Sequence, residues 1–147
     1  MQLQIKFPGN NKIAKGLIAF VVIISCNACA EKVNFQTSTV VPAARGFVKV
    51  TRDNNKNYVI HLQLANLAEV DRLQTAKGTY VVWMITDKEE TKNIGLLNSS
   101  TGMFSNKLTA SFDTSSSTRP KQIFITAEDD GAIQYPGNEI ILSTDRF

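Results

Sequence analysis

Cysteine and histidine are scarce in this sequence, which has two cysteines, Cys26 and Cys29, and one histidine, His61, among its 147 residues. A structural zinc site needs about four such ligands. Exported domains that depend on disulfides carry several cysteine pairs, and a glycine-rich phosphate loop is missing as well. The sequence therefore predicts no metal site, no cofactor and a fold that stands without a disulfide framework.

A hydrophobic run long enough to cross a membrane is also missing. The uncharged apolar run covers Gly16–Ser25, which is ten residues, whereas a spanning helix needs about 20. Three lysines precede the run and no acidic residue precedes Glu31. This pattern is typical of a secretory signal peptide, so we expect residues 1–25 to be removed and the mature chain to be extracytoplasmic.

The end of this segment, Ile23-Ile24-Ser25-Cys26, resembles a bacterial lipobox, with an aliphatic residue three positions before the cysteine and a small residue directly before it. We predict lipidation at Cys26, with Cys29 after Ala28 as the alternative. Several acyl chains on one cysteine give stable anchoring, which a single chain does not. The expected location is the outer face of the inner membrane or the outer membrane. A plain cleaved signal, or a Cys26–Cys29 disulfide, is the other interpretation.

Positive charge in excess is lacking once the signal is removed. Its three lysines account for the net charge of +3, because 13 Lys and Arg and 13 Asp and Glu remain from Cys26 onward. Binding to nucleic acid needs lysine and arginine gathered on one face, so the composition indicates no nucleic-acid partner. The remaining 122 residues correspond to one domain of ordinary size.

Alternating apolar and polar residues predict β-strands over most of this domain. Residues 26–42 are expected to form a tether or edge strand, and residues 43–147 a sandwich domain. The Asp53–Asn57 segment and the Asp130-Gly131 pair are predicted turns, Asp113–Arg119 a loop, and Ala65–Thr75 the only segment with helical character. The predicted strands are Phe47–Thr51, Tyr58–Leu64, Thr79–Thr86, Asn93–Leu97, Met103–Phe112, Gln122–Ala127 and Glu139–Ser143. These seven or eight short strands indicate an all-β, immunoglobulin-like antiparallel β-sandwich.

The order of several short motifs resembles one known family over about residues 33–145. The motifs are Ala44-Arg45-Gly46, Leu64-Ala65-Asn66-Leu67, Gly78 to Met84, Ile94-Gly95, Ile125 to Glu128 with Gly131 and Pro136, and Ile140-Ile141-Leu142. In this order they resemble the extracytoplasmic C-terminal domain of anti-sigma-K factors, which implies a role in envelope signalling. Members of that family usually carry an N-terminal sigma-binding domain and a transmembrane helix. Here only 15 residues without His or Cys precede the apolar run, so we expect the outer domain alone, mounted on lipid and without direct sigma-factor contact.

Three features of the sequence are candidate sites. Trp83 is predicted to be the core anchor against which the second sheet packs. His61 falls on the outward phase of its strand, and a Ser-His-Asp or Cys-His site would have to use it. The cluster Glu128-Asp129-Asp130-Gly131 is interpreted as an exposed hairpin turn, with a calcium site as the alternative.

These features together predict a non-catalytic, membrane-anchored lipoprotein that acts as a binding or regulatory module in envelope signalling. Its partners are expected to be the membrane, through the N-terminal lipid, and an unidentified envelope protein. A structural or carrier lipoprotein is the first alternative, and a hydrolase that uses His61 is the second.

Overall fold

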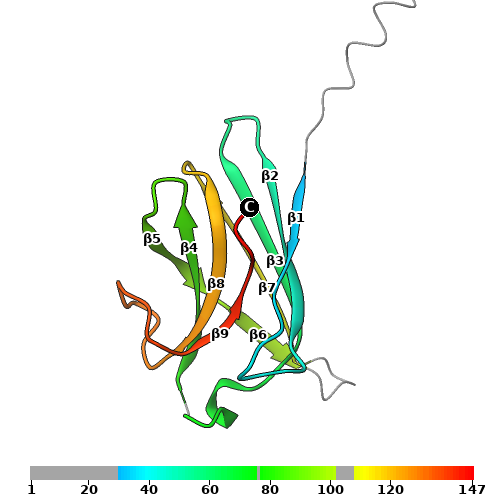
Figure 1. Cartoon of the computed structure of the whole chain (residues 1–147), viewed down its shortest axis with the longest axis vertical. Coiled ribbons are helices and arrows are strands. Elements are labelled where there is room, and N and C mark those ends of the chain that lie inside the picture. The colour runs from blue at the N-terminus through cyan, green and yellow to red at the C-terminus, as the bar shows by residue number, and fades with distance from the viewer. Residues whose placement is uncertain (1–29, 76, 102–107) are drawn as a thin grey trace, which may run out of the picture.

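Two antiparallel β-sheets pack face to face in the computed structural model, which describes residues 30–75, 77–101 and 108–147 (Figure 1). The first sheet contains, in spatial order, β1 (Glu31–Asn34), β2 (Arg45–Arg52), β3 (Tyr58–Leu67), β7 (Leu108–Ser116) and β6 (Asn98–Thr101). The second contains β5 (Thr91–Leu96), β4 (Thr79–Thr86), β8 (Pro120–Glu128) and β9 (Ile140–Ser143). A single turn of 3₁₀ helix, η2 (Val70–Arg72), lies between β3 and β4. None of the helices in the described residues has the length and hydrophobicity needed to cross a membrane.

The strand order confirms the predicted all-β sandwich. Without β1, the first sheet has the order β2-β3-β7-β6 and the second the order β5-β4-β8-β9. These orders correspond to strands A-B-E-D and C′-C-F-G of an immunoglobulin-like sandwich. The described residues contain nine strands, and β6 over Asn98–Thr101 was not predicted.

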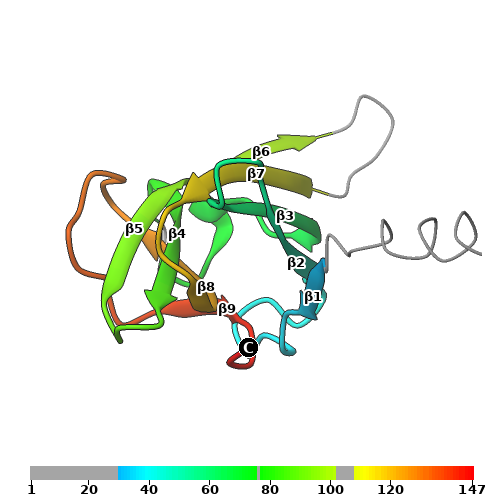
Figure 2. The same ribbon diagram turned by 90° about the horizontal axis from the view of Figure 1, so that it is seen from above.

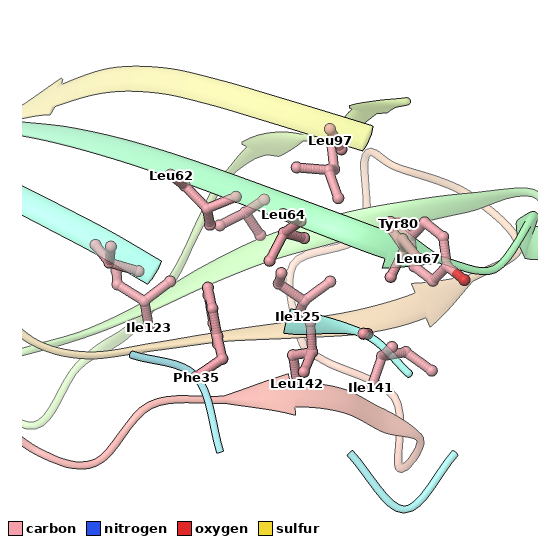
Figure 3. Packing of buried hydrophobic residues seen from close by; sticks show 14 of the residues in the cluster. Phe35, Leu62, Leu64, Leu67, Tyr80, Leu97, Ile123, Ile125, Ile141 and Leu142 are labelled. Carbon is pink, nitrogen blue, oxygen red and sulfur yellow. The ribbon is translucent and has the colours of Figure 1, made fainter. Parts of the chain in front are cut away.

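The main core fills the space between the two sheets. Leu62 and Leu64 of β3 point toward Ile123 and Ile125 of β8 (Figure 3). All four side chains are buried, as the alternation in the sequence requires, because every second residue of a strand faces the same side. The inward phases of β2, β3, β4, β7 and β8 therefore supply most of this core.

The segment that follows β1 joins the two sheets along one side of the sandwich (Figure 2). Phe35 forms an isolated bridge with Thr144, and the backbone N–H of Gln36 donates to the carbonyl of Ser143 at 2.8 Å. The Ser38 hydroxyl accepts from the N–H of Val41 at 2.9 Å, which turns the chain back toward β2. The part of residues 26–42 that the structure describes thus contributes an edge strand and a closing segment to the sandwich.

Trp83 is buried, with 0% of its surface exposed, but the prediction that it faces the second sheet is wrong. It belongs to a separate cluster with Val81 and Phe124 on the outer face of the four-stranded sheet, and Ile133 of the β8–β9 loop packs against this cluster. Its neighbours in sequence, Tyr80, Val82 and Met84, take the inward phase of β4 instead. The loop that follows β8, and not the opposite sheet, therefore removes the indole from solvent.

Three local predictions also need correction. The predicted loop Asp113–Arg119 is strand as far as Ser116, because β3 pairs with β7 up to Tyr58 opposite Ser116 and the backbone ladder outweighs the polar composition. Helical character in Ala65–Thr75 is confined to η2, since β3 continues to Leu67. Asp130-Gly131 is not a tight hairpin but part of the loop 129–139 between β8 and β9. The beginning of the predicted strand Met103–Phe112 lies outside the described residues.

Candidate functional site

A groove lies on the outer face of the five-stranded sheet. This face is turned away from β4 and β8 of the second sheet (Figure 2). Its volume is about 830 Å³, within the range of roughly 300–1,000 Å³ that is usual for ligand sites. Two rows of outward-facing cross-strand neighbours form most of its lining, to which Phe35, Gly46, Leu64 and Ala110 also contribute. Asn34, Phe47, Gln63 and Ser111 make the first row, and Arg45, Ala65 and Thr109 make the second.

Differences in side-chain size along these rows give the groove its depth. Ala65 lies between Arg45 on β2 and Thr109 on β7, so a single methyl group separates two longer side chains. Gln63 occupies the corresponding place between Phe47 and Ser111. The sheet twist curves such a face, and the small residues leave its middle unfilled.

Arg45 is the most strongly positioned charged group of the groove. Its Nη1 donates to the carbonyl of Pro42 at 2.5 Å and to the carbonyl of Ala44 at 2.6 Å. Both hydrogens of Nη1 are therefore engaged, whereas Nε and Nη2 make no hydrogen bond to the described residues. These two nitrogens form the edge of a guanidinium that binds a carboxylate through two parallel hydrogen bonds.

Phe47 lines the groove, and Lys32 lies over its ring just outside the lining. The Lys32 ammonium lies 3.9 Å from the centre of the Phe47 ring, a cation–π contact worth about 0.5–1 kcal/mol at an exposed site. This contact holds a second positive charge beside the first row. Lys49, on the same outward phase of β2, lies opposite Lys32 of β1 and opposite His61 of β3 in the strand register.

His61 lies on the same face and contacts an acid. Its Nδ1 is 2.5 Å from Oδ1 of Asp113 on the neighbouring strand β7. Within the described residues, no hydrogen bond joins His61 to a serine, and His61 is not part of the groove lining. His61 and Asp113 are therefore adjacent, as the base and the acid of a catalytic triad are. In the described residues no serine hydroxyl is hydrogen-bonded to the imidazole ring.

The three carboxylates of the acidic cluster at the end of β8, Glu128, Asp129 and Asp130, each interact with a different partner. The Glu128 carboxylate, which is 8% exposed, accepts from the N–H of Gly137 at 2.7 Å. Asp129 pairs with Lys77 at 2.8 Å, and this hydrogen bond raises the pKa of the lysine. Asp130 accepts from the N–H of Ala132 within the loop. In the part of the chain that the structure covers, no three His, Cys, Asp or Glu side chains converge on a point where a metal ion could bind.

The groove residues were not predicted as a site. Phe47 was the one residue whose position in the sequence could have indicated the groove. Val48 and Val50 take the inward phase of its strand, so Phe47 places an aromatic ring on the outward face. Arg45 entered the prediction only through the family motif. The two candidate lipidation sites, Cys26 and Cys29, and the signal peptide 1–25 lie outside the described residues.

Comparisons with protein-family models, with curated proteins and with solved structures find no match to this chain. The class of protein is therefore defined by the fold: a β-sandwich with two antiparallel sheets, one of which has on its outer face a groove of mixed polar and apolar lining in which Arg45 is the charged residue.

Proposed function

We propose that this protein is an exported, lipid-anchored binding module without catalytic activity, which presents the outer face of its five-stranded sheet to a ligand in the cell envelope. The groove with its positioned arginine is the observation that carries this proposal. A guanidinium that is already ordered loses less entropy when it binds a partner. The ordered Arg45 side chain therefore favours binding of a ligand in the groove.

The anchor determines which end of the sandwich lies near the membrane. Glu31, the first residue of β1, follows Cys26 by five positions, and five residues reach about 18 Å at most. Glu31 pairs with Val50, near the β2–β3 turn. A lipid on Cys26 therefore brings the β2–β3 turn close to the bilayer, while Arg45, at the opposite end of β2, lies farther away.

A regulatory role follows from the resemblance to the extracytoplasmic domain of anti-sigma-K factors. A lipid anchor occupies one leaflet and cannot transmit a change across the membrane. The domain therefore reports what it binds through another envelope protein and makes no direct contact with a sigma factor.

Two experiments test this proposal. Cys26→Ala should release the protein from the membrane fraction and abolish labelling with a radioactive fatty acid, whereas Cys29→Ala should change neither. Continued labelling of Cys26→Ala with loss in Cys29→Ala would place the lipid on Cys29. Labelling and membrane association that persist in both variants would refute a lipid anchor on either cysteine.

The binding face is tested by photocrosslinking in the native envelope. The crosslinker p-benzoylphenylalanine replaces Ser111 in the groove or, as a control, Thr91, which is exposed on β5 of the other sheet. We expect a discrete adduct from position 111 that disappears with Arg45→Ala, and none from position 91. Equal adducts from both positions, or none from position 111, would refute a binding role for this face.

A further inference from the structure

We infer that the groove binds a carboxylate-bearing glycan, a chain of uronate-type sugars, with Arg45 holding the carboxylate. This inference rests on the proposed binding function and names the chemistry of its ligand. It depends on three observations: the free edge of the Arg45 guanidinium, the polar side chains around it, and the charge of the face.

Arg45 supplies the carboxylate site. Because the carbonyls of Pro42 and Ala44 hold Nη1, the guanidinium has a defined orientation before any ligand arrives. Its Nε and Nη2 edge matches the two oxygens of a carboxylate. A lysine at this position would provide a point charge without that geometry.

Side chains with amide and hydroxyl groups supply the rest of the recognition. Asn34 and Gln63 carry both donors and acceptors, and Thr109 and Ser111 carry hydroxyl groups. Sugars present hydroxyl groups at every ring, and these side chains can donate to them or accept from them. Ala65 provides a small apolar floor for the C–H side of a sugar ring.

The position of the groove favours a glycan over a peptide. Peptides are often bound as an added strand at a sheet edge, where backbone N–H and C=O groups are unpaired. Most of the groove lies over β2, β3 and β7, each of which is already paired on both sides, and it reaches the edge strand β1 only at Asn34. Recognition there depends on side chains, which suits a ligand rich in hydroxyl groups.

The charge of the face favours an acidic glycan over a neutral one. The mature chain has equal numbers of acidic and basic residues, yet the described outward side chains of this sheet include Lys32, Arg45 and Lys49 against a single carboxylate, Asp113. Asp113 is itself paired with His61. Positively charged side chains therefore predominate around the groove, although the chain from Cys26 onward has no net charge.

Calorimetric titration of the full-length lipidated protein in detergent tests this inference. The probes are hexagalacturonate, which has a carboxylate on each sugar, neutral maltohexaose and hexaglutamate. We expect binding to hexagalacturonate that weakens with added salt, and little binding to the other two. Arg45→Lys should weaken the affinity about ten- to a hundredfold through loss of the paired hydrogen bonds. Arg52→Lys, on the same strand but outside the groove, should not change it.

Each other outcome overturns the inference. Comparable binding to maltohexaose would remove the role of the carboxylate, and preferred binding to hexaglutamate would replace the glycan with an acidic peptide. Equal effects of the Arg45 and Arg52 substitutions would move the site elsewhere. Absence of binding to hexagalacturonate would refute the ligand, while an adduct from position 111 in the envelope would still support the proposed binding function.

Discussion

The hydrogen bond between Trp83 and Thr126 offers a direct measure of how the outer cluster stabilises the sandwich. The indole Nε1–H donates to Oγ1 of Thr126 at 2.8 Å, and both residues are completely buried. The indole also stacks on Phe124, with ring centres 6.2 Å apart and an angle of 13° between the planes. A double-mutant cycle with Trp83→Phe and Thr126→Val removes the two partners separately and together.

The expected free energies follow from burial. Thr126→Val keeps the shape of the side chain but leaves the indole N–H without a partner, which costs about 1–3 kcal/mol. Trp83→Phe leaves the threonine hydroxyl unpaired and also removes ring volume. In the double variant no polar group is left unpaired, so its cost should be about 1–2 kcal/mol smaller than the sum of the single costs. Trp83→Ala, which also creates a cavity, should cost about 3–5 kcal/mol.

Urea unfolding followed by circular dichroism is the suitable assay, because three of the variants lack the only tryptophan. Strictly additive single costs would show that the hydrogen bond contributes nothing. An unchanged melting temperature for Trp83→Ala would refute the burial of the indole under the β8–β9 loop.

Three further predictions concern the same sheet. Asn93→Ala removes the side-chain amide that donates to the carbonyls of Gly131 and Ile133, both at 2.9 Å, so the emission of Trp83 should shift to longer wavelength and acrylamide should quench it more strongly. Burial raises the pKa of Tyr80 from 10.0 to about 12; the resulting stability is complete below pH 10 and should fall by about 2–3 kcal/mol between pH 10 and 12, measured by urea unfolding. Gly95→Ala should cost about 1–3 kcal/mol in the same assay, because Gly95 has φ +140° and a methyl group there would lie 2.8 Å from the Phe112 ring.

The predictions for Asn93 and Tyr80 each have a control variant, and all three have an outcome that would contradict them. Asn54→Ala, in the exposed β2–β3 turn, should leave Trp83 fluorescence unchanged, and equal quenching in Asn93→Ala and wild type would contradict the role of Asn93. Tyr80→Phe should lack the additional loss of stability between pH 10 and 12. An identical pH profile in that variant would show that the phenol does not titrate as described. A Gly95→Ala protein as stable as the wild type would show that the chain accommodates the methyl group without strain.

The two faces of β4 show which structural features the local sequence pattern predicts and which it does not. Thr79–Thr86 was predicted as a strand buried on both faces, with the bounds that the structure has, because a continuous run of apolar residues is typical of a central strand. The same pattern could not decide which face meets the other sheet. Tyr80 and Met84 face it, and Trp83 faces the β8–β9 loop. That choice depends on where β5 and β8 pair with β4 and on the path of a loop about 50 residues away in the chain.

Composition and two-residue periodicity were sufficient for the β-sandwich, since the sequence has many alternating strands and almost no helical pattern, which leaves a second sheet to cover their apolar faces. They also placed His61 on the outward phase of β3, where it lies. The pairing of His61 with Asp113, the edge strand β6 and the groove required the tertiary structure. All three arise from the register between strands distant in the sequence, and a shift of one residue in that register would turn Arg45, Phe47 and Gln63 toward the core.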